Sequence, residues 1–298
     1  MQPSNTPRLR EAEIEKESNF MKKVFAFALT ALLVMSMFAG CGSSAATPTT
    51  AAPAAEAPAA ETTAAAAELK TVEAGKLIMS TNASFPPYEM IADDGSFEGI
   101  DVEIAGAIAE KLGLELVVDD MDFSAALLAV QQNKSDIVMA GVSVTEERQL
   151  VMNFSNSYAT GVQTVIVKEG SDVTMDNLGE KMIGCQRGTT GYIYASDSPE
   201  NGGYGEDHVT AFDNGASAVQ ALLNGQVDCV IIDDAPAQEY VAQNPGLTTL
   251  EGAWVEEQYA IGMNKDNTAL LDAVNQALAE LTADGTVQKI IDKYISAN

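Results

Sequence analysis

The sequence contains few of the residues on which metal and redox sites depend. It has one histidine, His208, and three cysteines among its 298 residues. No second histidine or cysteine lies near His208, so a zinc site is not expected. Cys185 and Cys229 lie within apolar runs and are expected to be buried free thiols, with a disulfide as the alternative. We therefore expect neither a metal nor a cofactor.

Basic residues are also scarce. Lysine and arginine together number 16, against 43 aspartates and glutamates, which gives a formal net charge of −27. A protein this acidic repels phosphate groups. Nucleic acid and anionic membrane surfaces are therefore excluded as partners of the folded domain.

The most apolar segment, Val24 to Ala39, is short. It follows the basic start Met21-Lys22-Lys23 and precedes Gly40-Cys41-Gly42. This order is typical of a secretory signal peptide and not of a transmembrane helix. Cys41 resembles the acylated cysteine of a bacterial lipoprotein, although Phe38 stands where such signals usually have leucine. We expect residues 21–40 to be removed and Cys41 to anchor the protein outside the cytoplasm, on the outer face of the cell membrane. A plain signal peptide is the alternative.

Two other segments do not have the composition of a folded domain. Residues 1–20 are polar and precede a complete signal, so we interpret them as an extension from a misplaced start site, with Met21 as the true start. Residues 41–69 are mostly Ala, Thr, Pro and Ser, which is typical of a flexible tether. The folded region is expected to begin at residue 70.

The first part of the folded region alternates strands and helices. Apolar strands are expected at 76–81, 114–118 and 136–140, with helices at 101–112 and 123–132 between them. Asp101 is expected to cap the first helix, and Gly113 to end it. Alternation of this kind predicts a parallel sheet, in which ligands bind beyond the carboxyl ends of the strands.

The pattern then recurs at 181–232, which suggests two similar lobes. We expect the first lobe to comprise residues 70–162 and 257–298, with the second, residues 163–256, inserted into it. Two strands would then cross between the lobes and form a hinge around a cleft.

The stretch from Asp136 to Arg148 carries the clearest site chemistry. Its apolar run ends at Gly141, and Ser143, Thr145 and Arg148 follow. Glycine permits close approach of a ligand, the hydroxyls offer hydrogen bonds, and an arginine fork matches a carboxylate. The alternative for this stretch is a strand followed by a helix that Thr145 caps.

A series of motifs in order resembles the polar amino-acid-binding proteins of bacterial ABC importers, the family 3 extracellular solute-binding proteins. The motifs are Asn82-Ala83-Ser84-Phe85-Pro86-Pro87-Tyr88, Met121-Asp122-Phe123, Ala140 to Arg148, Gly188-Thr189-Thr190, Ile232-Asp233-Asp234 and Asp284-Gly285-Thr286. The resemblance implies an α/β fold of the periplasmic-binding-protein-like type II, with two doubly wound lobes joined by a two-strand hinge. It also implies capture of a free amino acid and its delivery to an ABC permease, by a protein expected to be monomeric.

The resemblance also assigns roles to residues of the cleft. Arg148 would bind the ligand α-carboxylate, with the backbone N–H groups of Ser143 and Thr190. Asp233 would bind the α-ammonium group, with the Gly141 carbonyl and the Ser143 hydroxyl. Phe85 and Phe123 would enclose the aliphatic part of the ligand.

Two positions bear on the ligand side chain. Asn82 stands where binders of glutamine and of cationic amino acids often have aspartate, and Gln186 is neutral where the glutamine binder has a lysine. A buried ligand cation would lack its partner at Asn82. We therefore expect an uncharged polar side chain, although Arg187 could favour an acidic one.

Two other functional classes are compatible with the same fold. One is an enzyme that resembles cyclohexadienyl or arogenate dehydratases, and the other is a ligand-sensing ectodomain. Apart from Asp233, the sequence shows no acid–base pair for the cleft, and His208 has no apparent nucleophile partner. We therefore expect a binding protein without enzymatic activity.

Overall fold

The computed structural model describes residues 69–295. The predicted start-site extension, the predicted signal peptide, the predicted lipidation site Cys41 and the predicted tether up to residue 68 all lie outside the described residues. Within residues 69–295, no helix combines the length and the apolar character needed to cross a bilayer.

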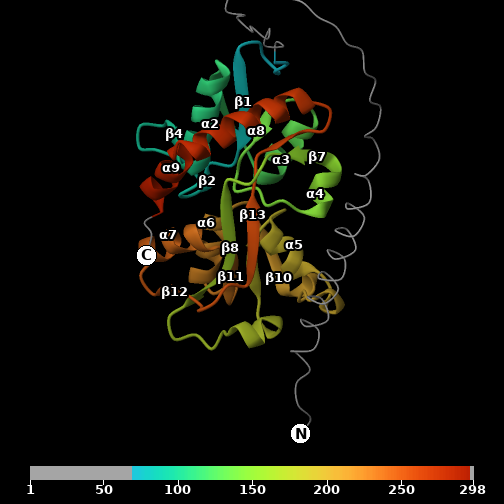
Figure 1. The fold of residues 1–298 in the computed structure, drawn as a ribbon. Coiled ribbons are helices and arrows are strands. Elements are labelled where there is room, and N and C mark those ends of the chain that lie inside the picture. Colours follow the sequence, from blue (N-terminus) through green and yellow to red (C-terminus); the bar gives the residue numbers. More distant parts are fainter. Residues whose placement is uncertain (1–68, 296–298) are drawn as a thin grey trace, which may run out of the picture. The chain divides into compact units, whose positions relative to one another are not determined.

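A five-stranded sheet forms the centre of the first lobe, in the order β5-β1-β6-β14-β7 (Figure 1). Its strands are β1 Lys76–Thr81, β5 Glu115–Asp120, β6 Ile137–Val138, β7 Met152–Phe154 and β14 Gly262–Asn264. β1 pairs in parallel with β5 and β6, whereas β14 is antiparallel to both of its neighbours. A strand from near the end of the chain therefore completes a sheet that begins near residue 76.

A six-stranded sheet forms the centre of the second lobe, in the order β10-β9-β11-β8-β12, with β13 also paired to β8. Its strands are β8 Ala159–Lys168, β9 Ile183–Gln186, β10 Val209–Phe212, β11 Cys229–Asp233, β12 Leu247–Thr249 and β13 Val255–Tyr259. β9 is parallel to both β10 and β11. Cys185 and Cys229 are both buried, as predicted, and the structure has them as free thiols.

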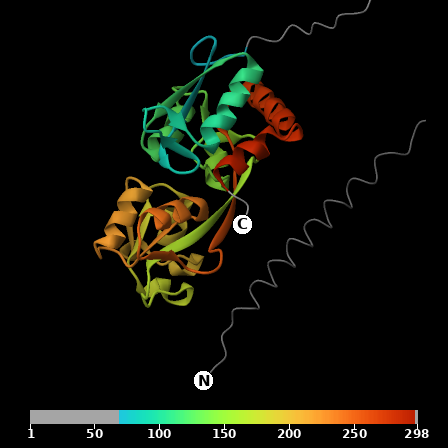
Figure 2. The same ribbon diagram turned by 90° about the vertical axis from the view of Figure 1, so that its left-hand side faces the viewer.

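Two paired strands lead from one lobe to the other. β8 and β13 are antiparallel, with register pairs from Val255↔Gln163 to Tyr259↔Ala159. In Figures 1 and 2 the two strands extend side by side between the lobes, with β8 leaving the first lobe and β13 returning to it. The predicted lobe boundaries, 162/163 and 256/257, fall inside these two strands and stay a prediction.

Helices follow the strands as the sequence pattern predicts. They are α2 Ile100–Leu112, α3 Phe123–Gln131, α4 Glu146–Val151, α5 Thr190–Ser196, α6 Gly215–Leu223, α7 Asp234–Gln243, α8 Thr268–Ala283 and α9 Thr286–Tyr294. Short 3₁₀ turns occupy Met175–Glu180, Pro199–Asn201 and Glu206–His208. The helices bury their apolar faces; in α2 these include Ile104, Ala105 and Ile108.

The predicted cap of α2 is wrong. The helix begins at Ile100 with Gly99 at the N-cap, and Asp101 lies in the first turn, fully buried. Its carboxylate does not cap the helix because it accepts hydrogen bonds from the backbone N–H of Gly141, at 2.9 Å, and from the Tyr158 hydroxyl, at 2.6 Å. Asp101 therefore ties α2 to the loop after β6 and to the chain that enters β8.

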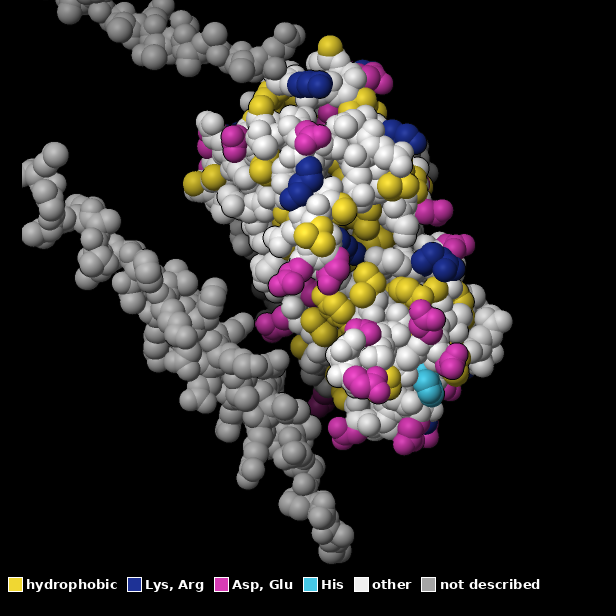
Figure 3. Space-filling view, turned by 90° about the vertical axis from the view of Figure 1, so that its right-hand side faces the viewer, with side chains coloured by type: hydrophobic (Ala, Val, Ile, Leu, Met, Phe, Trp, Pro, Cys, Tyr) yellow, Lys and Arg dark blue, Asp and Glu magenta, His cyan; other side chains and the backbone are white. Residues whose placement is uncertain are grey.

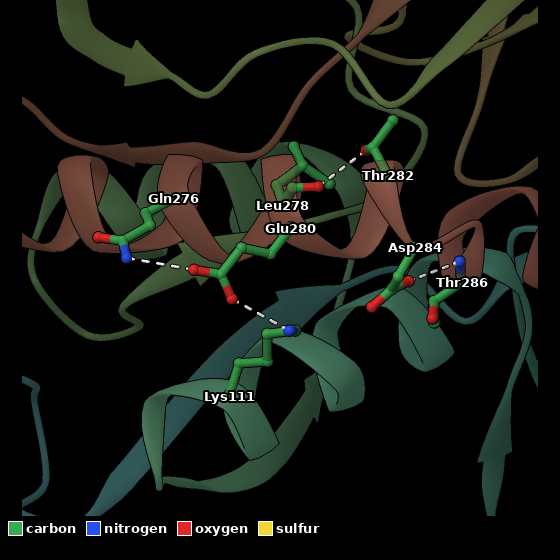
Figure 4. Close-up of polar contacts among 7 residues, drawn as sticks. All are labelled: Lys111, Gln276, Leu278, Glu280, Thr282, Asp284 and Thr286. Carbon is green, nitrogen blue, oxygen red and sulfur yellow. Dashed lines mark hydrogen bonds and ion pairs between the residues drawn. The ribbon is translucent and has the colours of Figure 1, made fainter.

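Helix α8 packs on α2 and carries polar contacts at its outer edge (Figure 4). Lys111 of α2 donates to Glu280 of α8 at 3.0 Å, and the Thr282 hydroxyl donates to the Leu278 carbonyl at 2.8 Å. The inner face of α8 is apolar and buried, with Leu270, Val274, Ala277, Leu278 and Leu281. Burial of this apolar face supplies most of the stabilisation, because exposed ion pairs contribute little.

A small antiparallel sheet lies on the chain between β1 and α2. It consists of β2 Ser84–Phe85, β3 Glu89–Ile91 and β4 Phe97–Glu98. It places Phe85 and Glu89, both buried, next to each other in register. Outside the core, acidic side chains are spread over the face shown in Figure 3, and basic side chains are fewer there.

Candidate functional site

All nine residues that the sequence predicts for ligand binding line one cavity. They are Asn82, Phe85, Phe123, Gly141, Ser143, Arg148, Gln186, Thr190 and Asp233. The first six belong to the first lobe, and the last three follow or end strands of the second lobe. The carboxyl ends of the strands therefore meet here, as expected for sheets of this kind.

The loop after β6 brings Gly141 close to an aromatic ring. Gly141 has a φ of 54°, and a Cβ there would lie 2.8 Å from a ring carbon of Phe85. Only glycine satisfies both the left-handed backbone and this close approach. The loop thus exposes its backbone to the cavity beside an aromatic side chain.

Arg148 follows this loop at the start of a short helix. Thr145 is the N-cap of α4 and accepts from the Arg148 N–H at 3.2 Å, as predicted for the alternative interpretation of this stretch. The guanidinium group donates to the carbonyls of Ser143, at 2.8 Å, and Gly188, at 3.1 Å. Its carbon lies 5.5 Å from the centre of the Phe123 ring. The cap therefore does not compete with the binding role, because it uses the backbone of Arg148 and leaves the side chain in the cavity.

The charge of Arg148 has no carboxylate partner in the described part of the chain. The side chain is buried, and none of the ion pairs among residues 69–295 includes it. Burial lowers its pKa, although the charge of Glu257 opposes that effect. A buried cation without an anion is costly, so this position favours an anionic group from a ligand.

Asp233 ends β11 on the opposite side of the cavity. Its Oδ2 accepts from Gln163 Nε2 at 2.8 Å, whereas Oδ1 accepts no hydrogen bond from the described residues. Burial raises its pKa to about 7; the nearby Tyr259 hydroxyl opposes that shift, and the charge of Glu257 adds to it. The carboxylate therefore lacks a cationic partner and favours one from a ligand.

Neutral amides connect the two lobes at another part of the cavity. Gln186 Nε2 donates to Asn82 Oδ1 at 2.9 Å, and the Asn82 amide donates to the Met121 carbonyl at 2.9 Å. The Tyr240 hydroxyl of the second lobe also donates to the Ser84 carbonyl of the first, at 3.1 Å. The lobes are thus in direct polar contact at Asn82 and at Ser84.

Two polar residues that line the cavity, Glu89 and Gln163, belong to none of the sequence motifs, nor does Glu257, which lies behind the cavity wall. Neither carboxylate oxygen of Glu89 accepts a hydrogen bond in the described part of the chain, and the side chain is fully buried. Burial raises the pKa of Glu89 well above its usual value, and the nearby carboxylate of Asp101 raises it further. Burial likewise raises the pKa of Asp101 to about 6.

A sequence signal existed for only one of these three residues. Glu257 and Tyr259 lie two residues apart on β13 and therefore on the same face of the strand. Both are buried, whereas Glu256 and Gln258 are exposed. Alternation of this kind marks Glu257 as inward-facing. Glu89 lies on a strand too short to show a period, and Gln163 lies within a long apolar run.

The chemistry of the cavity is that of binding. It is lined by one cation without a carboxylate partner, Arg148, by the carboxyl groups of Asp233 and Glu89, and by the aromatic rings of Phe85 and Phe123. Within residues 69–295, no group of three or more His, Cys, Asp or Glu side chains could hold a metal ion. A zwitterion with a second cationic group would match these charges.

Comparison with protein families identifies one that matches nearly the whole described region. Bacterial extracellular solute-binding proteins, family 3, match residues 77–297. Among characterised relatives, the ABC transporter arginine-binding protein 1 of Escherichia coli is 30% identical over 226 residues, which cover 74% of this chain and 91% of that protein.

Solved structures of similar proteins have the same fold. An ancestral arginine-binding protein bound to arginine has a TM-score of 0.69 and 37% identity, covering 74% of this chain and 99% of that one. An ancestral arginine-binding protein bound to glutamine also has a TM-score of 0.69, with 36% identity, covering 75% and 99%. These matches confirm the predicted fold class, a type II periplasmic-binding-protein fold.

Proposed function

Because the chain belongs to family 3 of the bacterial extracellular solute-binding proteins, we propose that it captures a free amino acid with a cationic side chain and delivers it to the permease of an ABC importer. One observation carries the choice of side chain: Glu89 is fully buried in the cavity wall, with both carboxylate oxygens unpartnered. The relative from Escherichia coli is named for arginine, which agrees with this choice.

In the proposed complex, the two ends of the amino acid bind opposite charges. Arg148 and the N–H groups of Ser143 and Thr190 bind the α-carboxylate. Asp233, the Gly141 carbonyl and the Ser143 hydroxyl bind the α-ammonium group. Charge-assisted hydrogen bonds contribute roughly 1.5–3 kcal/mol each, so two such anchors with aromatic burial can reach the ~8 kcal/mol of a micromolar site.

The side chain of the ligand then extends between aromatic rings toward Glu89. Phe85 and Phe123 are both buried in the cavity wall and enclose the methylene groups. Glu89 supplies the anion that Asn82 does not, which removes the reason to exclude a cationic side chain. A bound cation also stabilises the ionised form of Glu89, which burial otherwise disfavours.

An uncharged polar side chain is the second candidate. The hydrogen-bonded amides of Asn82 and Gln186 are neutral, and one of the similar solved structures is an ancestral arginine-binding protein bound to glutamine. A protonated Glu89 would serve such a ligand as a hydrogen-bond donor. The relatives described above are named as binding proteins and not as enzymes, so we do not extend the proposal to a dehydratase.

A thermal-shift screen of free amino acids tests the function and separates the two candidates. A ligand at 1,000 times its dissociation constant stabilises the folded state by about 4 kcal/mol. We expect arginine to raise the melting temperature of the wild type and to have no such effect on Arg148→Ala. Absence of a shift with every amino acid would contradict the proposed function.

Glu89→Gln identifies the side-chain class. Loss of a charge-assisted contact is expected to weaken arginine binding by roughly 10- to 100-fold while glutamine binding is kept or improved. Glu115→Gln, at an exposed position of β5, is the matched control and should change neither affinity. If Glu89→Gln and Glu115→Gln bind arginine equally well, the cationic assignment is wrong.

Membrane attachment and domain organisation complete the proposal. Cys41 is the lipid-anchored residue outside the cytoplasm, and residues 41–69 connect it to a monomeric binding domain. Its lobes comprise residues 70–162 with 257–298, and residues 163–256. Mass spectrometry of protein extracted from membranes tests the anchor, since Cys41→Ala should be recovered in the soluble fraction without the acyl mass.

A further inference from the structure

Glu257 fixes the direction of the hydrogen bonds on one wall of the cavity. Its Oε2 accepts from the Ser143 hydroxyl at 3.0 Å and from the Thr190 hydroxyl at 2.7 Å. It also accepts from Gln163 Nε2, at 3.1 Å. The carboxylate is 7% exposed and stands behind these three side chains, which line the cavity while Glu257 does not.

The side chains of Ser143, Thr190 and Gln163 direct their hydrogens away from the cavity, so their oxygen atoms can only accept hydrogen bonds from a ligand. A hydroxyl group has a single proton, and those of Ser143 and Thr190 both point to Glu257. The Gln163 amide has two, directed to Glu257 and, at 2.8 Å, to Asp233. Its carbonyl oxygen is buried and accepts no hydrogen bond from the described residues.

Arg148 forms no direct ion pair with Glu257. No ion pair within 4.0 Å joins them among residues 69–295, and the guanidinium group donates to the carbonyls of Ser143 and Gly188 instead. Ser143, Gln163 and Thr190 thus supply the direct hydrogen bonds to Glu257, all to Oε2, and Oε1 accepts none from the described residues. The nearby charge of Arg148 adds to this stabilisation, and the network depends on Glu257 being an acceptor.

We propose that Glu257 is a positioning residue for recognition of the ligand α-ammonium group. It takes the hydrogens of Ser143, Thr190 and Gln163 and leaves a wall of acceptors beside Asp233. The side-chain acceptors of this wall suit a group that donates three hydrogen bonds, whereas the backbone N–H groups of Ser143 and Thr190 stay available to the α-carboxylate. This inference rests on the proposed function, because it concerns the amino group of the captured amino acid.

An amide at position 257 would reverse part of the network. Its NH₂ group would donate to a hydroxyl, and that hydroxyl would turn its own hydrogen toward the cavity. A hydroxyl hydrogen facing the ligand ammonium group opposes binding, whereas a ligand without that group is not affected in this way. The ratio of the affinities for a ligand with the α-ammonium group and for one without it therefore reports the direction of the hydrogen bonds.

The test compares L-arginine with 5-guanidinopentanoic acid, which is arginine without its α-amino group, by isothermal titration calorimetry. In Glu257→Gln the ratio of the two affinities is expected to fall by about tenfold or more, mostly through weaker arginine binding. Glu256→Gln is the matched control, because it removes the same charge from the exposed face of β13. Its ratio should equal that of the wild type.

Thr190→Val provides a second test if Glu257→Gln does not fold. It removes one acceptor from the wall and leaves Glu257 in place, so the ratio is again expected to fall. An unchanged ratio in a folded Glu257→Gln or Thr190→Val protein overturns the inference and leaves the proposed function intact. If the thermal-shift screen selects glutamine as the ligand, the same comparison uses glutamine and glutaramic acid, which is glutamine without its α-amino group. If the wild type binds no amino acid, the proposed function and this inference both fail.

Discussion

Gln186 donates a hydrogen bond to Asn82 at 2.9 Å and so joins the two lobes directly within the cavity. Neither side chain carries a charge. The contact can therefore hold the lobes together without competing for the charged groups of a ligand. It contributes to the contact between the lobes whatever the protonation state of the carboxylates around it.

Replacement of Gln186 by alanine should weaken ligand binding by loosening this contact. A neutral hydrogen bond contributes about 1 kcal/mol, so we expect the dissociation constant of the ligand to rise about fivefold, mainly through faster release. Stopped-flow fluorescence measures the release rate. Gln220→Ala, at an exposed position of α6, is the control; equal release rates in both variants would remove Gln186 from the closure mechanism.

Ligand affinity should fall as the pH decreases below about 7. Asp233 has a pKa raised to about 7 in the free protein, mainly by burial, while a bound ammonium group favours its ionised form. Proton release on binding then costs about tenfold in affinity per pH unit below that value, and more if Glu89 also ionises. Calorimetry in buffers of different ionisation enthalpy measures the released protons; binding independent of pH between 5.5 and 8 (roughly the range over which such a group titrates) would contradict this assignment.

Stability of the unliganded protein should change with pH in the opposite direction to ligand affinity. A carboxyl group whose folded pKa is raised binds more protons in the folded state than in the unfolded state. Between the ordinary value of 3.8 and about 7 for Asp233, the free energy of unfolding is therefore expected to fall as the pH rises. Urea denaturation at several pH values measures the slope, and Asp233→Asn should reduce it, although Asp101, with a pKa of about 6, keeps part of it.

Replacement of two glycines by alanine should change the stability of the protein in opposite directions. A Cβ at Gly161 of β8 would lie 2.5 Å from the Tyr259 ring and 2.7 Å from Asp233 Oδ1, so Gly161→Ala should lower both the melting temperature and ligand affinity. At Gly106 in α2 the nearest atom, in Leu116, lies at 3.9 Å. Gly106→Ala is therefore expected to stabilise the protein by about 0.5–1 kcal/mol. If Gly161→Ala binds ligand as the wild type does, the cavity is less tightly packed than described.

The ion pair between Lys111 and Glu280 should contribute little to stability. Its side chains are 31% and 50% exposed, and such pairs typically contribute about 0–1 kcal/mol. Lys111→Met is expected to lower the free energy of unfolding by less than about 1 kcal/mol, whereas Val274→Ala in the buried face of α8 should lower it by about 1–3 kcal/mol. Chemical denaturation of both variants checks the order, and a larger effect from Lys111→Met would reverse our account of this contact.

The fold could be predicted from the sequence because its signals are local and repeated. The apolar run at Ile137 and Val138 and the stop at Gly113 belong to single elements, so their meaning does not depend on distant residues. Asp101 was misinterpreted for the opposite reason. Its carboxylate bonds to Gly141 and Tyr158, and no local pattern distinguishes a capping aspartate from one held by a distant loop.

Only the residues of the candidate site that belong to recognisable sequence motifs could be predicted. Arg148 and Asp233 belong to motifs that resemble a known family, and both line the cavity. Glu89 lies next to one of these motifs, but its importance comes from complete burial without a hydrogen-bond partner, which depends on how Asp101 and the small sheet pack around it. A lack of partners is a property of the folded structure and has no sequence pattern.

The position of β14 in the first sheet makes the two lobes depend on different lengths of chain. A chain truncated after Tyr259 contains every strand of the second sheet, whereas the first sheet lacks the strand that separates β6 from β7. We expect such a chain to form the second lobe without a stable first lobe. Arg148 and Asp233 therefore become opposite walls of one cavity only when β14 is present, and a chain truncated before Gly262 is expected not to retain an amino acid.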